Sequence, residues 1–366
     1  KALQLKADFS EAIENLGVVY IASGRLEESL INFRKVIDLK PKSISAHVNL
    51  GYALQDIGRL QEAEASYLEA LKLDPRNKQV NFNIGVMYYH ADRFEEAIKH
   101  LEAVGSKKAK MYILRCLYLM DDRTSFCDLL EHFVSEREIN AMVGSLVSRS
   151  EIRYGLNVKN LFCKKPLNYL QTVDLTTQYD FQNLFTKPME TLLIQNRVPM
   201  RRQSLLSNGV QTAGNLFELG ATPTAEIEKI IRVEIDNYLT KFRDSGEGFL
   251  KNWPSEYSLS GWLVSLRSGG ELAPHIHEEG WLSGTIYINV PSDLEDDSGS
   301  LVVTMEEDKY LSAQSTGYKK VVEISTGTLV LFPASLLHYT IPFESKEQRI
   351  VLAFDVIPKK KTMLGV

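Results

Sequence analysis

Hydrophobic and small residues recur at a period of 34 between residues 9 and 109. The matching positions of the three copies are Leu16, Leu50 and Ile84; Gly17, Gly51 and Gly85; Tyr20, Leu54 and Tyr88; Arg25, Arg59 and Arg93; Leu26, Leu60 and Phe94; Ser29, Ala63 and Ala97; and Phe33, Tyr67 and Leu101. Small residues let two antiparallel helices approach closely, and large apolar residues fill the seam between them. Pro41 and Pro75 end the second helix of their copies. The pattern therefore predicts stacked helical hairpins.

The helical periodicity continues in a weaker form over residues 110–150, which include MYILRCLYLM and TSFCDLLEHFV. The 34-residue hairpin resembles the tetratricopeptide repeat, and this resemblance implies a right-handed superhelix with a concave groove. The third copy lacks the closing proline and its pattern ends after Val104, as terminal repeats often do. We therefore expect a tetratricopeptide-repeat domain over residues 1–150, with clear repeats over 9–109 and degenerate ones after them.

One repeat position is polar in all three copies, at Asn15, Asn49 and Asn83. Asparagine is also tolerated on a helix near a turn, and that interpretation stays open. An amide both donates and accepts hydrogen bonds, so a row of three can hold the backbone of an extended peptide whatever its sequence. A similar asparagine ladder lines the repeats of the O-linked N-acetylglucosamine transferase. The resemblance implies a protein or peptide bound in the groove.

Residues 151–250 carry less information and are typical of loops and short helices, with two prolines interrupting them. We expect a helical connector over 151–190 and a further domain over 191–366. The stretch NGVQTAGNLFE resembles a turn that leads into a helix. After it, TPTAEIEKIIRVEIDNYLTKF opens with Thr222 and Pro223 and carries isoleucines at helical spacing, which predicts a helix that braces one face of the C-terminal part of the chain.

From Tyr257 onward the pattern changes to short apolar strands. The predicted strands are YSLSGWLVSLR, ELAPHIH, SGTIYINV, GSLVVTM, KKVVEIS, GTLVLFP, LLHYTIPF and RIVLAFDVI. Turn sequences such as SGG, SDLEDDSG and ESKEQ separate them, and eight short strands with frequent turns indicate a sandwich or jelly roll. The expected fold class is α+β multidomain: an N-terminal α-solenoid followed by a double-stranded β-helix (jelly roll) with bracing helices.

Two histidines stand two residues apart in PHIHEEGWLSGTIYINVP. On a strand, residues i and i+2 point to the same side, so His275 and His277 can grip one metal ion. His338 follows the apolar run GTLVLFP and supplies the distant third ligand that such a site needs. Imidazole ligands suit iron, copper, nickel or zinc. A chance pairing of ordinary core histidines is the alternative.

The stretch PHIHEEGWLSGTIYINVP resembles the PHxHxxxxxSGxxYxxxP sequence of 2-oxoglutarate- and Fe(II)-dependent oxygenases. The layout is also similar to aspartyl/asparaginyl β-hydroxylase, in which tetratricopeptide-type repeats precede such a domain. By this resemblance His275 is the first metal ligand, His338 is the distal one, and the cofactors are Fe(II), 2-oxoglutarate and O2. The third ligand is usually Asp or Glu. Here either His277 takes its place or Glu279 supplies the carboxylate, and both arrangements stay open.

Oxygenases of this kind carry a basic residue about ten positions after the distal histidine, where it binds the far carboxylate of 2-oxoglutarate. Arg349 follows His338 by eleven residues and enters the strand RIVLAFDVI, which suits a fork-shaped donor facing a carboxylate. A solvated charge at the edge of a strand is the alternative. Ser265 and Tyr287 lie on strands expected to line the barrel and are candidates for further hydrogen bonds to the cosubstrate.

The cupins share the pair of histidines and a later Pro–His segment. Here, however, Pro342 stands where a cupin carries asparagine, and no glutamate occupies the expected place after Glu279. We therefore expect a 2-oxoglutarate-dependent dioxygenase that hydroxylates a protein or peptide side chain presented by the repeat groove. The alternatives are a cupin-like metal enzyme that does not use 2-oxoglutarate and a repeat scaffold whose β-rich domain is not catalytic.

The composition, with 366 residues, a formal charge of −5 and 44% hydrophobic residues, is that of a globular protein. A weakly acidic chain offers no electrostatic case for nucleic-acid binding. Three cysteines without CxxC spacing argue against a disulfide framework and fit a reducing cytoplasm. No apolar run approaches the ~18 residues of a membrane helix, and the first residues form an amphipathic pattern rather than a signal peptide. The initial Lys1 fits a fragment of a longer protein.

Overall fold

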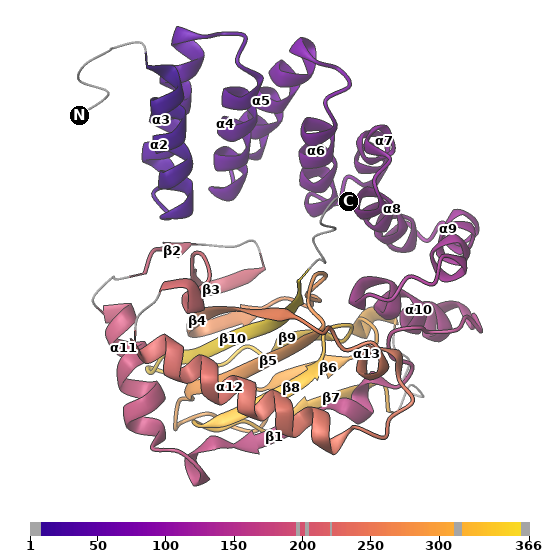
Figure 1. Cartoon of the computed structure of the whole chain (residues 1–366), viewed down its shortest axis with the longest axis vertical. Helices are drawn as coiled ribbons and strands as arrows, with labels where there is room; N and C mark the ends of the chain where they lie inside the picture. The colour runs from indigo at the N-terminus through magenta and orange to yellow at the C-terminus, as the bar shows by residue number, and fades with distance from the viewer. Residues whose placement is uncertain (1–8, 195–197, 202–204, 220–221, 311–316, 360–366) are drawn as a thin grey trace. The chain divides into compact units, whose positions relative to one another are not determined.

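The computed structural model describes residues 9–194, 198–201, 205–219, 222–310 and 317–359. They divide into two compact units (Figure 1). One unit runs to Leu130 and takes in the short segment that begins at Pro199, and the other begins at Glu131 and holds the rest of the chain. The domain boundaries proposed from the sequence, at residues 150 and 190, stay a prediction.

The first unit consists of helical hairpins. Its helices are α2 (Ser10–Ala22), α3 (Leu26–Leu39), α4 (Ile44–Asp56), α5 (Leu60–Leu73), α6 (Lys78–His90), α7 (Phe94–Val104), α8 (Lys107–Leu119) and α9 (Arg123–Ser135), the last of which crosses the boundary of the unit. Helices α2, α4 and α6 begin 34 residues apart, as the sequence period predicts. The predicted repeat architecture is confirmed.

Small residues allow the close approach of the two helices of each hairpin. A Cβ added at Gly17 would lie 2.6 Å from the ring of Phe33, and one added at Gly51 would lie 2.7 Å from the ring of Tyr67. Phe33 and Tyr67 are themselves equivalent repeat positions and are fully buried. A larger residue at either glycine would push the helices apart, which explains the glycine at this position of each repeat.

The second unit combines helices with antiparallel strands. Its helical elements are α10 (Ala141–Tyr154), η1 (Pro166–Tyr169), η2 (Leu175–Thr177), η3 (Gln182–Thr186), α11 (Lys187–Ile194), η4 (Leu216–Leu219), α12 (Thr222–Lys241), α13 (Gly248–Lys251) and η5 (Asp308–Tyr310). A buried ion pair holds α10 in this unit, because Arg149 Nε lies 2.9 Å from Glu306 Oε1. The sequence pattern had placed this helix in the degenerate part of the repeat stack.

The strands form two antiparallel sheets. They are β1 (Gln171–Asp174), β2 (Met200–Arg201), β3 (Leu206–Thr212), β4 (Tyr257–Leu272), β5 (Leu282–Asn289), β6 (Leu301–Thr304), β7 (Lys319–Val322), β8 (Thr328–Pro333), β9 (Leu337–Thr340) and β10 (Arg349–Pro358). Within the second unit, the large sheet has the order β1-β8-β5-β10-β4-β3 and the small sheet has the order β7-β6-β9, while β2 lies in the short segment that belongs to the first unit. The predicted jelly-roll class is confirmed.

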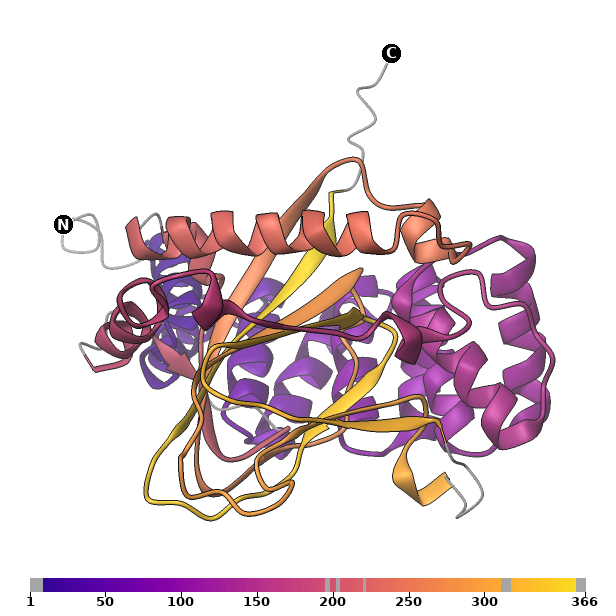
Figure 2. The ribbon, with the colours of Figure 1, turned by 90° about the horizontal axis from the view of Figure 1, so that it is seen from below.

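Side chains of the large sheet alternate between two cores. On β10, Ile350, Leu352 and Phe354 join the core that includes Ile231 and Ile235 of α12, the predicted bracing helix (Figure 1; Figure 2). The residues between them point to the other face, where a second core includes side chains of both sheets. Successive side chains of a strand point to opposite faces, so alternate residues of β10 pack against α12 and the others face the space between the two sheets.

One local prediction is wrong and a second holds only in part. The segment ELAPHIH is not a separate strand, because β4 continues to Leu272 and only an isolated bridge follows at His275. Of the stretch interpreted as a turn into a helix, residues 208–212 belong to strand β3, and the rest turns into the short helix η4. The expected connector also contributes a strand, β1, which pairs with β8. Pairing with distant strands overrides the weak local signal in each case.

Two expectations from composition can be compared directly with the structure. All three cysteines, Cys116, Cys127 and Cys163, are free thiols, as predicted. Within the described ranges, no helix is both long enough and apolar enough to cross a membrane.

Candidate metal centre

The three predicted ligand histidines come from two segments that the backbone ties together. His275 and His277 lie in the irregular stretch between β4 and β5, and His338 lies on β9. The backbone N–H of His275 donates to the carbonyl of His338 at 3.1 Å, and the N–H of His338 donates back to His275 at 2.9 Å. This reciprocal pair brings the two segments into one site although 60 residues separate them.

The three imidazoles converge on one point. One ring nitrogen of each of His275, His277 and His338 lies within 4.8 Å of those of the others. The Nε2 atoms of His275 and His277 are 3.2 Å apart, and the ring centroids of His275 and His338 are separated by 4.2 Å. Among the described residues, these three are the group of His, Cys, Asp or Glu side chains whose ligand atoms lie close enough together to hold one metal ion.

In each ring it is Nδ1 that faces a backbone or carboxylate oxygen. Nδ1 of His275 lies 2.8 Å from the carbonyl oxygen of Ala273, and Nδ1 of His338 lies 3.2 Å from that of Leu336. Nδ1 of His277 lies 2.6 Å from a carboxylate oxygen of Asp355. These oxygens only accept, so each Nδ1 carries the proton and each Nε2 keeps a lone pair. This donor set fits a divalent transition metal.

Burial favours the neutral form of His338. His338 is 3% exposed. Burial, followed by the proximity of His275 and His277, holds the pKa of His338 well below its ordinary value. A neutral imidazole is the form that ligates a metal, so His338 is in the form that can bind a cation.

The alternative carboxylate ligand does not join this group. Glu279 is exposed and lies outside the cluster formed by the three histidines. The geometry therefore favours the arrangement with His277. The roles of His275, His277 and His338 as ligands remain a proposal.

The sequence pattern missed Asp355. This aspartate lies on β10, 78 residues after His277, and is only 6% exposed. Ser283 of β5 donates to the same carboxylate oxygen at 2.7 Å. A single acidic residue inside the apolar run RIVLAFDVI was the available signal. It could not be interpreted before the partner strand was known.

A second polar cluster occupies the same face of the large sheet. Arg349, at the start of β10, is 3% exposed, and its Cζ atom lies 5.0 Å from the ring centroid of Tyr287. Arg349 Nε, Tyr287 OH and Thr285 Oγ1 are among the buried polar atoms of the described chain that have no hydrogen-bond partner. Burial lowers the pKa of Arg349 and raises that of Tyr287.

Unpaired buried donors favour a ligand that supplies acceptors. Each such group costs about 1–3 kcal/mol while it is unpaired, and a buried guanidinium costs more. A carboxylate would satisfy the fork of Arg349 and accept from the hydroxyls of Tyr287 and Thr285. These residues therefore fit the far carboxylate of 2-oxoglutarate.

The prediction for Ser265 is wrong. Ser265 pairs with Ile350 across β4 and β10, whereas Arg349 pairs with Leu266. Paired residues of antiparallel strands point to the same face, so Ser265 lies on the face opposite to Arg349. Its hydroxyl donates to Gln348 Oε1 at 3.1 Å.

Models of known families match both parts of the chain. A model described as "Tetratricopeptide repeat" matches residues 48–107, and one described as "TPR repeat" matches residues 17–58. A model described as "Putative 2OG-Fe(II) oxygenase" matches residues 260–355, a range that holds the three histidines, Arg349 and Asp355. The chain joins tetratricopeptide repeats to a 2OG-Fe(II) oxygenase domain.

Similar solved structures are distant from this chain. A Pseudomonas putida prolyl-4-hydroxylase is 11% identical, with coverage of 52% of this chain and 93% of that chain and a TM-score of 0.37. Pseudomonas aeruginosa pilF is 23% identical, with coverage of 38% of this chain and 66% of that chain, just under two thirds, and a TM-score of 0.35. A search of curated proteins found no match.

The repeats of this chain present the predicted asparagines at equivalent helix positions. Asn15 is exposed on α2, whereas Asn49 on α4 and Asn83 on α6 are half-buried. Asn49 Nδ2 donates to Glu14 Oε1 at 3.1 Å, and Asn83 Oδ1 accepts from Gln79 at 2.8 Å. Each of these two amides therefore makes a hydrogen bond within its own unit.

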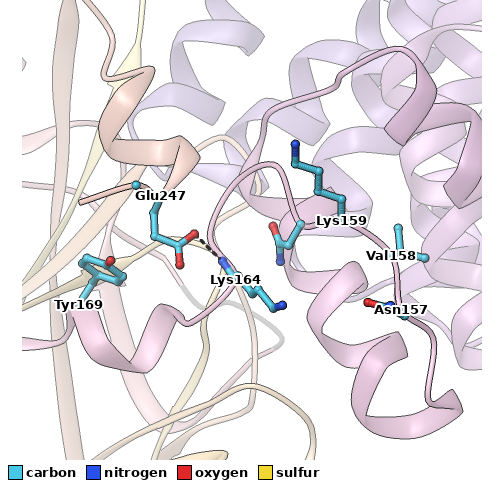
Figure 3. Close-up of a pocket in the computed structure, with 8 residues that line it drawn as sticks. Asn157, Val158, Lys159, Lys164, Tyr169 and Glu247 are labelled. Carbon is cyan, nitrogen blue, oxygen red and sulfur yellow. Dashed lines mark hydrogen bonds between the residues drawn. The ribbon is translucent and has the colours of Figure 1, made fainter. Parts of the chain in front are cut away.

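A separate hollow of about 560 Å³ lies in the second unit (Figure 3). It is lined by residues 157–160 with Lys164, Tyr169, Gly246 and Glu247. Glu247 is engaged there, because its carboxylate accepts from the backbone N–H of Lys164 at 2.8 Å (Figure 3). None of the candidate ligand or cosubstrate residues lines this hollow, so it is distinct from the candidate metal centre.

Proposed function

We propose that this protein is an Fe(II)- and 2-oxoglutarate-dependent dioxygenase that hydroxylates a side chain of a protein or peptide. The carrying observation is that the interior of one jelly roll holds both a convergent set of imidazole nitrogens and a buried, incompletely paired arginine. The match of residues 260–355 to the oxygenase family supports the same reaction class.

Each residue has a stated task in this proposal. His275, His277 and His338 hold the metal through Nε2. Arg349, with the hydroxyls of Tyr287 and Thr285, binds the far carboxylate of 2-oxoglutarate. When bound, iron and 2-oxoglutarate supply the activation of O2. The chain contributes binding, orientation and the exclusion of water from a buried interior.

The arginine cluster separates this function from a metal enzyme that does not use 2-oxoglutarate. Such an enzyme has no need for a guanidinium that is 3% exposed and has an unpaired Nε. Burying such a charge is costly unless a ligand compensates for it. The presence of Arg349 beside Tyr287 therefore favours a dicarboxylate cosubstrate.

The proposed function is tested by titrating 2-oxoglutarate into the Fe(II)-loaded protein under anaerobic conditions. We expect a visible charge-transfer band that saturates with the cosubstrate, and release of succinate once O2 and candidate peptides are added. Metal binding with no band and no succinate would leave the cupin-like alternative, and absence of metal binding would leave the scaffold.

The repeats are proposed to bind the polypeptide substrate in their groove. Replacing Asn15, Asn49 and Asn83 together with alanine should raise the KM for a peptide substrate about tenfold or more, because each lost hydrogen bond contributes about 0.5–1.5 kcal/mol. Turnover of 2-oxoglutarate without peptide should change little. The measurement is succinate release as a function of peptide concentration.

Asn32 offers a matched control for this triple variant. It lies on α3, the second helix of its hairpin, where its amide donates to the carbonyl of Glu28 at 2.7 Å. Asn32→Ala should leave the peptide KM unchanged. An equal loss of peptide-dependent and peptide-independent turnover in the triple variant would count against the asparagine ladder.

A further inference from the structure

Asp355 has no assigned role in the metal centre, yet it contacts one of the three histidines. Its Oδ1 atom lies 2.6 Å from Nδ1 of His277 and 2.7 Å from the hydroxyl of Ser283. The side chains of His277 and Asp355 are 14% and 8% exposed, so solvent screens their interaction poorly. A buried carboxylate is costly unless a charged or hydrogen-bonding partner compensates for it.

The two other histidines provide an internal comparison. Their Nδ1 atoms meet backbone carbonyls, at Ala273 and Leu336, whereas Nδ1 of His277 meets a carboxylate oxygen. His277 also occupies the position at which the resembling oxygenases usually carry a carboxylate ligand. This chain therefore also has a carboxylate near the metal position, but the carboxylate belongs to Asp355 and lies behind the ring of His277.

The surroundings of Asp355 hold its carboxylate at that place. Ser283 and Asp355 are paired residues of β5 and β10 and so share one face of the sheet. A Cβ added at Gly280 would lie 3.2 Å from Asp355 Oδ1, so a residue without a side chain lets the ligand segment pass close to the carboxylate. The carboxylate is thus enclosed by His277, Ser283 and Gly280.

We infer that Asp355 is a positioning residue that replaces the usual carboxylate ligand from outside the coordination sphere. Asp355 accepts a hydrogen bond from Nδ1–H of His277, which fixes the tautomer and the orientation of the ring. The same hydrogen bond makes Nε2 a stronger electron-pair donor to the metal. The carboxylate also supplies the negative charge that three neutral imidazoles lack. The inference rests on the proposed function, because it assumes that the three histidines hold a divalent metal.

The test measures metal affinity rather than turnover. Cobalt(II) is titrated anaerobically into the full metal-free chain, and its visible absorption reports both affinity and coordination geometry. Asp355→Asn keeps the size of the side chain and removes its charge. We expect a 10- to 100-fold weaker affinity together with a changed cobalt spectrum. Wild-type affinity and spectrum in D355N would overturn the inference.

Glu234 provides a matched control. It is a buried carboxylate of α12, 2% exposed, that accepts from the hydroxyl of Tyr179 at 3.2 Å and does not contact the histidines. Glu234→Gln should leave the cobalt affinity unchanged. A similar loss in E234Q and D355N would show a general effect of removing buried charge and would overturn the inference.

A charge-exchange pair tests the role directly. His277→Asp sets a carboxylate beside Asp355, and two buried carboxylates repel each other. H277D should therefore bind cobalt weakly, and H277D/D355N should bind at least about tenfold more tightly than H277D, because it restores a single carboxylate. No gain in the double variant would overturn the inference.

Two further outcomes are distinguished by these measurements. If D355N alone is too unstable for titration, Ser283→Ala is measured in its place. This variant removes one hydrogen bond from the carboxylate of Asp355 and keeps its charge. Unchanged cobalt affinity and spectrum in S283A would then overturn the inference. If the wild-type chain binds no cobalt or iron, the proposed function fails instead. The failure of the positioning role and that of the metal centre are thus separate results.

Discussion

Replacing His338 with alanine is expected to abolish measurable Fe(II) binding, with at least about a 100-fold loss of affinity. Outer-shell partners of a metal typically contribute 10- to 100-fold, and a ligand contributes more. His338 is buried against both His275 and His277, and its loss leaves two members of the one ligand group found among the described residues. Equilibrium dialysis of the metal-free protein against Fe(II) or cobalt(II) gives the affinity.

Two variants control for the loss of His338. Tyr339→Phe alters the next residue of β9, whose hydroxyl donates to Asp308 at 2.8 Å, and should leave the affinity unchanged. Glu279→Ala separates the two ligand arrangements that the sequence left open. Unchanged binding in E279A, with loss in His277→Ala, supports the three-histidine site, whereas the reverse result would restore Glu279 as the ligand.

Replacing Arg349 with methionine should weaken the binding of 2-oxoglutarate by roughly 30-fold or more. Truncating one member of a buried charge pair costs about 2–5 kcal/mol, and each 1.4 kcal/mol is tenfold in affinity. The side chain is buried over Tyr287, and its Nε lacks a partner within the described chain. Anaerobic titration of the Fe(II)-loaded protein with 2-oxoglutarate measures the shift.

The same substitution should act in the opposite direction on the ligand-free protein. Burial lowers the pKa of Arg349, which means that the folded state disfavours its charged form. R349M removes that cost and keeps an apolar side chain against Tyr287, so the melting temperature without ligands should stay equal or rise. Wild-type protein should gain stability from added 2-oxoglutarate with metal, and R349M should not.

Arg267 is the matched control for these two measurements. It lies one residue after Leu266 on β4 and is exposed. Arg267→Met should change neither the affinity for 2-oxoglutarate nor the stabilisation by it. If R349M bound the cosubstrate as tightly as the wild type, the dicarboxylate site would have to lie elsewhere.

The repeat domain was readable from the chain because its packing is local and periodic. Gly17 meets Phe33 only 16 residues later, and the same pairing recurs at Gly51 and Tyr67. Both hairpins use the same glycine–aromatic contact, so the residues that make this contact recur in the sequence at the repeat period. The bracing helix α12 was equally clear, because its isoleucines follow the helical period.

The β-rich part was readable only in outline. Alternating apolar runs predicted most strands from Tyr257 onward, but the face of each side chain depends on register between distant strands. Ser265 was placed in the interior and lies on the opposite face, since Arg349 pairs with Leu266 rather than with Ser265. A shift of one residue in register reverses every such assignment.

The residue types alone were enough to propose the histidines and Arg349 as site residues, because few other side chains suit a transition metal or a dicarboxylate. Tertiary structure was needed for everything that depends on proximity across the sheet. It placed His338 against His275, left Glu279 exposed, and brought Asp355 to His277 from 78 residues away. Local pattern reports the chemistry a residue can perform, whereas long-range strand pairing decides which residues perform it together.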